Sequence, residues 1–157
     1  MTSVELVAAC LERGLTVATA ESLTAGQVSA TIADVPGCSA VFRGGVVAYA
    51  TDIKGSVLGL RASDLEHVVS EQVAGELARR VCEVLDADLG LSTTGVAGPD
   101  SLDGQTAGSV WIAVHERASG RTTTRHLNLP GERAAVRAAA TAAVIDLATA
   151  CAVSGHA

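Results

Sequence analysis

The chain has 157 residues, 48% of them hydrophobic and only 2% aromatic, and 11 Lys and Arg against 17 Asp and Glu give a formal net charge of −6. This length accommodates one domain with a sizeable core, which here must consist of Ala, Val and Leu. An acidic chain without a basic run argues against nucleic acid and anionic membranes as its main partners.

The first half of the chain alternates between helical and strand-like patterns. Thr2 and Glu5 form the capping-box pattern of a helix start, and Gly14 stands where that helix would end. Gly44 and Gly45 lie in an apolar run and suggest a bulge or a close backbone contact. We predict helices over 2–13 and 24–33, strands over 15–20 and 41–50, and short helical turns over 51–58 and 63–67.

The second half begins with a long amphipathic helix that Ser70 caps. We predict helices over 70–85 and 133–152, strands over 87–94, 109–116 and 122–127, and a Gly- and Pro-rich loop over 95–108. This order of elements predicts the α/β class, as a three-layer α/β/α sandwich on a mixed, mostly parallel sheet of about five strands. We expect one domain over residues 1–157.

Targeting signals and metal motifs are not evident. Glu5 and Glu12 interrupt the N-terminus, so it does not read as a signal peptide. No apolar run is expected to approach the roughly 18 residues of a membrane span, and we expect a cytoplasmic protein. The cysteines form no CxxC pair and the four histidines are scattered, which favours buried thiols over a zinc site or a disulfide scaffold. The cysteines are Cys10, Cys38, Cys82 and Cys151.

The stretch over residues 17–26 is the first candidate for chemistry. A buried strand stops at small polar residues and restarts as a helix. Such a corner leaves the first N–H groups of the helix unpaired at the sheet edge, where open α/β sheets bind ligands. Ser22 lies at this corner and is our candidate nucleophile. The alternative is that Ser22 or Thr24 only caps the helix.

Two further candidates follow the next strand. If the strands are parallel, the loops after them meet at one edge, which brings Tyr49 and Lys54 within reach of Ser22. A serine needs a base, and no histidine is placed to form a triad. Lys54 could serve if burial keeps it neutral, and Tyr49 could relay the proton. The alternatives are a solvated surface lysine and a core-filling tyrosine.

Two more segments carry candidate binding residues. Gly95 and Gly98 lie three residues apart in a loop whose N–H groups could bind an oxyanion or a phosphate, although such loops are often simple turns. Arg133, with Arg137 one turn on, stands at the start of the last helix and opposes its dipole. These residues could bind phosphate or could simply be solvated.

The ordered set of these motifs resembles the CinA C-terminal domain family, the nicotinamide-nucleotide amidohydrolases. The likeness covers residues 15–137, and the chain is similar to the free-standing form of the family. Leu23 and Ala25 stand where the family pattern has Cys and Gly. The matching segments are Ala-Glu-Ser-Leu-Thr-Ala-Gly at 20–26, Gly-Val-Val-Ala-Tyr-Ala-Thr-Asp-Ile-Lys at 45–54, Gly-Val-Ala-Gly-Pro at 95–99, Ala-Gly-Ser-Val-Trp at 107–111 and Pro-Gly-Glu-Arg at 130–133.

The resemblance implies hydrolysis of the carboxamide of nicotinamide mononucleotide to nicotinate mononucleotide and ammonia, without a metal or other cofactor. Ser22 would attack the amide, Lys54 would take its proton and Tyr49 would assist, while backbone N–H groups near 24–26 or in the loop after Gly95 would hold the oxyanion. Tyr49 is also the best-placed wall for the pyridinium ring. The residues assigned to substrate contacts are Glu21, Thr24, Gly26, Gly95, Gly98, Arg133 and Arg137.

Two other functions stay open at this point. The same pocket could hold a nucleotide without turnover, as a binding or regulatory module, since a fold does not establish an activity. A different small amide could be the substrate. The Ala-rich last helix and a surface poor in charge also make a homodimer a reasonable expectation.

Overall fold

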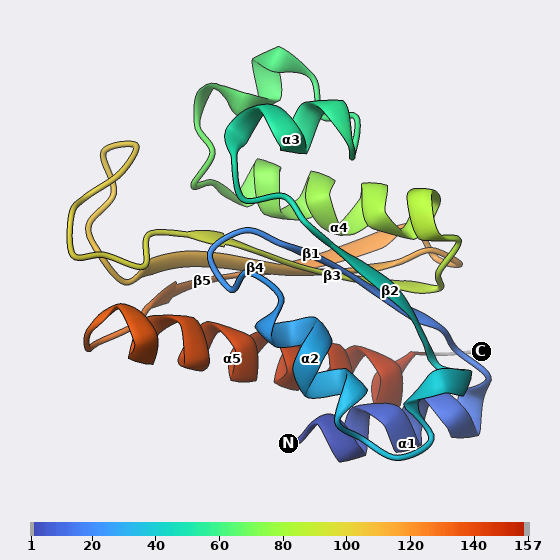
Figure 1. The fold of residues 1–157 in the computed structure, drawn as a ribbon. Helices are drawn as coiled ribbons and strands as arrows, with labels where there is room; N and C mark the ends of the chain where they lie inside the picture. Colours follow the sequence, from blue (N-terminus) through green and yellow to red (C-terminus); the bar gives the residue numbers. More distant parts are fainter. Residues whose placement is uncertain (1, 156–157) are drawn as a thin grey trace.

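In the computed structural model of this chain, which describes residues 2–155, five strands form one sheet in the order β2-β1-β3-β4-β5 (Figure 1). β1 pairs in parallel with both β2 and β3, and β4 is antiparallel to both β3 and β5. All strands except β4 therefore run the same way, as predicted. The strands are β1 (Val17–Glu21), β2 (Phe42–Val47), β3 (Leu89–Gly95), β4 (Ser109–Glu116) and β5 (Arg121–Asn128).

Helices cover both faces of the sheet, which confirms the three-layer α/β/α architecture (Figure 1). One face carries α1 (Ser3–Arg13), α2 (Gln27–Ala33) and α5 (Arg133–Ser154). The other face carries α3 (Thr51–Ser56), the 3₁₀ turn η2 (Ala62–Glu66) and α4 (Glu71–Leu85). A second 3₁₀ turn, η1 (Cys38–Ala40), was not predicted.

Local sequence explains most helix boundaries. The capping box of Thr2 and Glu5 is present, and Gly14 ends α1 in the left-handed conformation at φ 64°. The hydroxyl of Ser70 accepts a hydrogen bond from the N–H of Val73 at the start of α4. The start of α2 differs from the prediction, because residues 22–26 form a turn and the helix begins only at Gln27.

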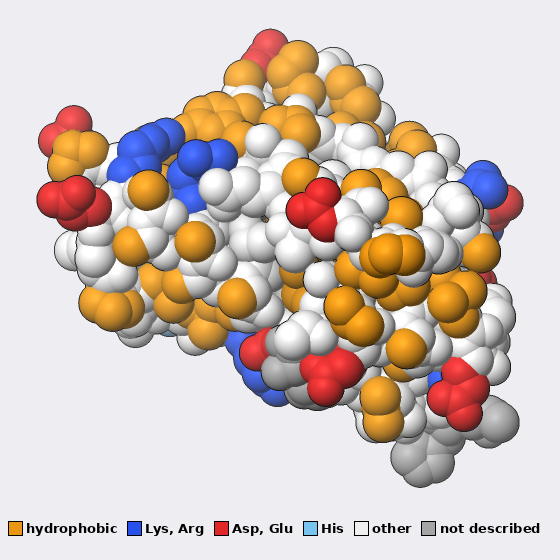
Figure 2. Space-filling model, turned by 60° about the horizontal axis from the view of Figure 1, so that its bottom comes forward, with side chains coloured by type: hydrophobic (Ala, Val, Ile, Leu, Met, Phe, Trp, Pro, Cys, Tyr) orange, Lys and Arg blue, Asp and Glu red, His pale blue; other side chains and the backbone are white. Residues whose placement is uncertain are grey.

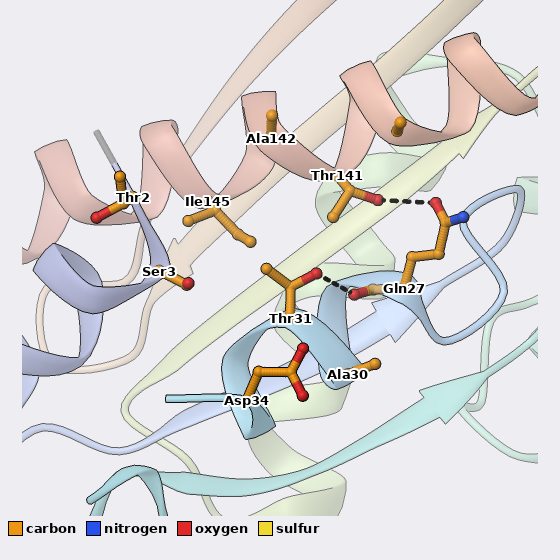
Figure 3. Close-up of a pocket in the computed structure, with 10 residues that line it drawn as sticks. Thr2, Ser3, Gln27, Ala30, Thr31, Asp34, Thr141, Ala142 and Ile145 are labelled. Atoms are coloured by element: carbon orange, nitrogen blue, oxygen red, sulfur yellow. Dashed lines mark hydrogen bonds between the residues drawn. The ribbon is translucent and has the colours of Figure 1, made fainter. Parts of the chain in front are cut away.

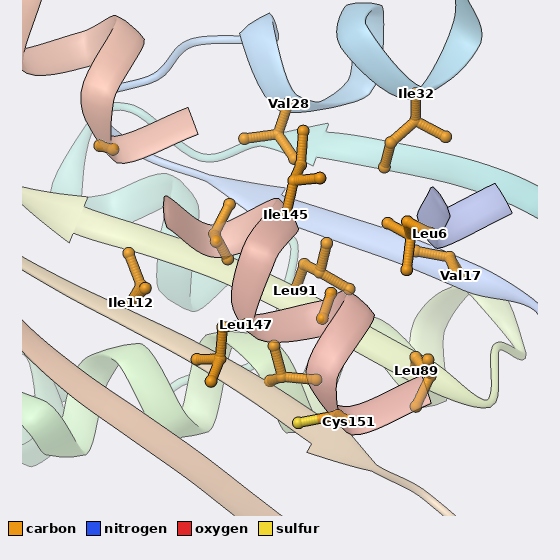
Figure 4. Close-up of a cluster of buried hydrophobic side chains, with 14 of the residues drawn as sticks. Leu6, Val17, Val28, Ile32, Leu89, Leu91, Ile112, Ile145, Leu147 and Cys151 are labelled. Atoms are coloured by element: carbon orange, nitrogen blue, oxygen red, sulfur yellow. The ribbon is translucent and has the colours of Figure 1, made fainter. Parts of the chain in front are cut away.

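Apolar side chains fill both interlayer spaces. The larger cluster lies between the sheet and α1, α2 and α5, where Leu6, Val28, Ile32, Leu91 and Ile145 are buried together (Figure 4). A second cluster lies under α4 and includes Leu58, Leu77 and Val81. Both clusters consist almost wholly of aliphatic side chains, and close packing of such side chains is the main stabilising contribution to a layered fold.

Gly45 allows a close approach between β2 and its neighbours. A Cβ atom at this position would lie 2.3 Å from the hydroxyl oxygens of both Ser29 and Thr19. The β1–β2 register also shifts between Val17 and Ala18. The structure thus contains both features that the two glycines suggested, a close contact and an irregular pairing.

The last helix corrects one expectation. By length and composition alone, α5 is long and apolar enough to cross a membrane, so the chain does contain a run of that length. In the structure 56% of the most apolar 18-residue stretch of this helix is buried. This burial against α1, α2 and the sheet is what the core helix of a layered fold requires.

The face that carries α1, α2 and α5 is poor in charge. Figure 2 shows hydrophobic side chains spread over this face, with a few acidic and basic groups between them. Exposed alanines of α5 contribute, among them Ala134, Ala138 and Ala142. Scattered exposed apolar groups are normal for a monomer, and the expectation of a homodimer stays a prediction.

The cysteines agree with their prediction as inert thiols. Cys10, Cys82 and Cys151 are buried, and Cys38 is partly buried. Burial raises the pKa of Cys10 to about 11 and that of Cys82 to about 12, and it also raises the pKa of Cys151. Thiols with raised pKa values hold little thiolate and react slowly.

Candidate functional site

The loops that follow β1, β2 and β3 meet at one edge of the sheet, as the parallel order predicted. Together with the start of α5 they enclose a cavity of about 400 Å³. Its volume lies within the range of small-molecule sites. The lining residues are Ser22, Leu23, Tyr49, residues 95–102 and Arg133.

Ser22 is one of the residues that line this cavity. It directly follows β1, and its backbone N–H donates to the carbonyl of Thr93 on β3 at 3.1 Å. The residue is 9% exposed, so its hydroxyl faces a cavity rather than open solvent. The backbone then turns, since the N–H of Ala25 donates to the carbonyl of Ser22. Ser22 therefore occupies the strand-to-helix corner that the sequence indicated.

Lys54 lies beside Ser22. It belongs to α3, which begins four residues after β2 ends, and its side chain reaches the hydroxyl of Ser22. It is 2% exposed, and its Nζ lies 3.0 Å from Ser22 Oγ. Burial lowers the pKa of Lys54 from 10.5 to about 8. The alternative of a solvated surface lysine is therefore wrong.

The other contacts of Lys54 orient its amine. Nζ donates to the carbonyl oxygens of Ala48 at 2.7 Å and Tyr49 at 3.1 Å. A neutral amine has two hydrogens and one lone pair. When both carbonyls accept its hydrogens, the lone pair is directed to the remaining neighbour, the hydroxyl of Ser22. The same geometry lets the charged amine donate to all three oxygens, so the site accommodates either protonation state.

Lys54 is also the only lysine in the chain, beside ten arginines among the 11 basic residues. Arginine cannot be deprotonated in a protein, whereas a buried lysine can lose its proton near neutral pH. The sequence analysis selected Lys54 from its place after a predicted strand, but it did not use the fact that this lysine is the only one in the chain.

Tyr49 and Arg133 form one wall of the cavity. Tyr49 is 51% exposed, so it is not core filling, and its hydroxyl accepts from Nη2 of Arg133 at 2.6 Å. Nη1 of Arg133 donates to the carbonyl of Gly98 at 2.7 Å. Among the described residues that line this cavity, Arg133 alone carries a positive charge. The structure thus brings Tyr49, predicted as a catalytic residue, together with Gly98 and Arg133, predicted as binding residues.

Glu21, Thr24 and Gly26 do not line the cavity in the part of the chain that the structure describes. Glu21 is 1% exposed, and its carboxylate accepts from the hydroxyl of Thr24 and from the N–H groups of Gly26, Val28 and Ser29. The prediction that the first N–H groups of the helix are open to a ligand is therefore wrong. The carboxylate of Glu21, the last residue of β1, already occupies them. We therefore withdraw the side chains of Glu21 and Thr24 and the N–H of Gly26 as substrate contacts, and of these residues only the backbone N–H of Thr24 stays without an acceptor in the described part of the chain.

Arg137 also lies elsewhere than predicted. Its Nε donates to the carbonyl of Leu23 at 2.8 Å and its Nη2 to the carbonyl of Thr24 at 3.1 Å. It does not belong to the described lining of the cavity. The guanidinium holds the turn after Ser22 from the α5 side, which corrects its assignment as a phosphate ligand.

Gly95 and Gly98 line the cavity, but Gly95 also has a packing role. A Cβ atom at Gly95 would lie 2.7 Å from the carbonyl oxygen of Ser109 on β4. In the turn beside them, the N–H groups of Leu23 and Thr24 have no acceptor within residues 2–155. Two free donors directly after a nucleophile are suited to bind an oxyanion.

Thr93 and Ala48 are site residues that sequence reasoning missed. The hydroxyl of Thr93 bonds to that of Thr24 at 2.8 Å, and its carbonyl binds Ser22. The signal was present, because Ser92, Thr93 and Thr94 place three hydroxyl groups in a buried strand. Ala48 acts through its backbone carbonyl, which no side-chain pattern reveals.

A second, larger hollow of about 530 Å³ lies between α1, α2 and α5 (Figure 3). It shares no lining residue with the cavity beside Ser22. Its polar groups bond to each other, with Thr141 donating to the side chain of Gln27 and Thr31 to the backbone carbonyl of Gln27. Its described lining contains no serine–lysine or comparable pair, so the smaller cavity is the candidate site.

Comparison with known proteins gives one consistent result. The family model described as the CinA C-terminal domain matches residues 2–152. A competence-damage inducible protein of Levilactobacillus brevis is 47% identical over 134 residues, which are 84% of this chain and 32% of that protein. A CinA-like protein of Frankia casuarinae is 41% identical over 139 residues, 87% of this chain and 32% of its own length. The chain thus spans about a third of the length of these curated relatives.

Solved structures agree with the sequence matches. A competence-damaged protein (CinA) superfamily protein from Klebsiella pneumoniae superposes with a TM-score of 0.91 at 29% identity, over 96% of this chain and 95% of that one. A competence or damage-inducible protein from Enterobacter asburiae gives a TM-score of 0.90 at 30% identity, over 97% and 99% of the two chains.

Proposed function

This chain belongs to the CinA C-terminal domain family, and on that premise we propose that it is a serine–lysine amidohydrolase of nicotinamide mononucleotide. The products are nicotinate mononucleotide and ammonia. The observation that supports the proposal most directly is the 3.0 Å contact between Lys54 Nζ and the Oγ of Ser22, a residue that lines the cavity. A base within hydrogen-bond reach is what a serine nucleophile requires.

The reaction proceeds in two halves. Ser22 Oγ bonds to the carboxamide carbon while its proton passes to neutral Lys54, and the N–H groups of Leu23 and Thr24 bind the oxyanion. The Lys54 ammonium then protonates the leaving nitrogen, ammonia departs and an ester on Ser22 remains. Water attacks this ester as Lys54 takes one of its protons, and return of that proton to Ser22 Oγ breaks the ester bond. The product acid gives the second proton of the water to solvent and leaves as the carboxylate.

The cavity wall offers contacts for the rest of the substrate. The exposed ring of Tyr49 provides a flat surface for the pyridinium. Arg133 provides the charge for the phosphate, supported by its bonds to Gly98 and Tyr49. As part of the same proposal, the protein resides in the cytoplasm, where it would meet such a nucleotide.

The test separates this enzyme from the two other functions. Purified protein is incubated with nicotinamide mononucleotide, nicotinamide riboside, nicotinamide and glutamine, and released ammonia is measured beside a Ser22→Ala control. We expect ammonia from the mononucleotide, a mass increase on the peptide that contains Ser22 after acid quench, and neither signal from the control. Binding without turnover would favour the regulatory module, and turnover of another amide alone would reassign the substrate.

Arg137 provides a prediction on the turn itself. Because its guanidinium binds the carbonyls of Leu23 and Thr24 rather than lining the cavity, Arg137→Met should lower kcat by about tenfold and change KM little. Steady-state kinetics on the mononucleotide measures both constants. A rise in KM with unchanged kcat would restore Arg137 as a substrate contact.

A further inference from the structure

Glu21 lies at the centre of a buried hydrogen-bond network directly before the nucleophile. Its Oε1 accepts from Thr24 Oγ1 at 2.7 Å and from the N–H groups of Gly26 at 3.2 Å and Val28 at 2.8 Å. Its Oε2 accepts from the N–H of Ser29 at 3.0 Å and from Ser29 Oγ at 2.7 Å. Every contact uses the carboxylate as an acceptor, so its lone pairs are fully occupied.

The network extends to the neighbouring strand β3 and further back along β1. Thr24 Oγ1, which donates to Glu21, lies 2.8 Å from Thr93 Oγ1 on β3. Ser29 Oγ lies 2.6 Å from Thr19 Oγ1 on β1, in the space that Gly45 of β2 leaves open. The carboxylate thus ties the turn over residues 22–26 to the sheet on one side and to the first residues of α2 on the other.

That turn needs such support. Ala25 has φ 47° and Gly26 has φ 95°. A non-glycine residue in the left-handed region costs about 1–2 kcal/mol, and the exposed side chain of Ala25 makes few contacts that could offset this cost. A turn held in a strained conformation depends on its hydrogen bonds to keep that shape.

We propose that Glu21 is a positioning residue for the reaction, an inference that rests on the proposed function. Its carboxylate fixes the turn so that Ser22 Oγ stays at Lys54 Nζ and the N–H groups of Leu23 and Thr24 stay free for the oxyanion. It does so without touching the substrate, because it is 1% exposed and does not belong to the described lining of the cavity.

The experiment compares Glu21→Gln with the wild type. Glutamine keeps the shape but turns one acceptor oxygen into a donor that faces other donors. We expect kcat on nicotinamide mononucleotide to fall about 10–100-fold, since displacement of a catalytic group by about 1 Å has effects of this size, while KM stays close to the wild-type value. Labelling of Ser22 by an alkyl fluorophosphonate, in which an Oγ–P bond forms and fluoride leaves, should slow in parallel.

Asp88→Asn is the matched control. The Asp88 carboxylate accepts from the N–H and the hydroxyl of Thr16, both at 2.8 Å, at the opposite end of β1. The Asp88→Asn substitution should lower the unfolding midpoint of the protein, while kcat and the labelling rate should remain at wild-type values. If Glu21→Gln does not fold, Thr24→Val removes one donor of the network and should lower kcat, and Thr24→Ser should restore most of it.

The outcomes separate the two proposals. A Glu21→Gln protein with wild-type kcat and labelling rate overturns the positioning role alone, and so does a rise in KM by itself. Wild-type protein that labels at Ser22 but hydrolyses none of the amides overturns the proposed reaction, while the ratio of labelling rates still decides whether Glu21 positions Ser22. Wild-type protein that neither labels nor turns over overturns both.

Discussion

Replacing Lys54 by methionine should abolish most of the ammonia release and at the same time make the protein more stable. Loss of the base lowers kcat/KM by about 10²–10⁴-fold. A lysine whose pKa falls from 10.5 to about 8 on folding lowers the free energy of unfolding at pH 7 by roughly 3 kcal/mol. Methionine avoids this penalty but gives up the hydrogen bonds to Ala48 and Tyr49, each worth about 1 kcal/mol. We therefore expect a net gain of about 1–2 kcal/mol, measured by urea unfolding.

Lys54→Arg is the control for this result. Arginine keeps the charge and the capacity to donate but cannot be deprotonated, and its larger guanidinium would replace a side chain that is only 2% exposed. Lys54→Arg should lose activity as Lys54→Met does. It should also lose stability, whereas Lys54→Met should gain it. A Lys54→Met protein that keeps activity within about tenfold of wild type would remove Lys54 as the base. A Lys54→Met protein that unfolds more easily than wild type would show that the contacts of Lys54 stabilise the folded protein by more than the burial of its charge costs.

The sequence predicted the architecture well because the pattern of apolar residues reflects burial directly. Helix α4 shows this, since its helical apolar spacing and Ser70 cap reappear at the predicted place. The edge where three loops meet followed from parallel strand order alone. With the loops placed, Ser22 and Lys54 came together although 32 residues separate them in the chain.

The errors concern side-chain direction, which spacing does not determine. The helix N-terminus seemed open because nothing in the pattern showed that the side chain of Glu21, at the end of β1, binds the first N–H groups of α2. Arg137 seemed to face a ligand because only the packing of α5 against the turn directs it to two carbonyls. In both cases a polar group was expected to serve a ligand and instead satisfies buried backbone groups, which a fold must pair before any ligand arrives.

Glu21 and Arg137 stabilise the turn after Ser22 by binding different backbone groups of it. Glu21 binds the donors of the turn from inside, and Arg137 binds its acceptors from the α5 side. The two donors left over, on Leu23 and Thr24, lie beside Ser22. Hydrogen bonds to Glu21 and from Arg137 thus fix the turn while these two donors stay free, which is what a preorganised catalytic loop needs.

Activity should fall about tenfold for each pH unit below 8, because the proposed mechanism needs neutral Lys54 and burial lowers its pKa to about 8. At pH 6 we expect kcat/KM about 100-fold below its plateau. Lys54 is the only lysine in the chain, so selective ¹⁵N labelling of lysine gives one side-chain signal, and its NMR titration should show the same midpoint. A midpoint near the ordinary lysine value of 10.5, or a rate that does not depend on pH between 6 and 9, would contradict the lysine base.

The same titration fixes the sign of a stability change. Lys54 has a lower pKa folded than unfolded, so between about pH 8 and 10.5 the unfolded chain binds more protons and stability rises with pH. Below pH 8 both states are protonated and the full penalty of burying the charge remains; above 10.5 both are neutral and it vanishes. Wild-type protein should therefore gain up to roughly 3 kcal/mol over this range relative to Lys54→Met, which lacks the titrating group. Urea unfolding of the two proteins at pH 7.5 and 10 measures the difference. If the free energy of unfolding changes equally with pH in both proteins, folding does not lower the pKa of Lys54.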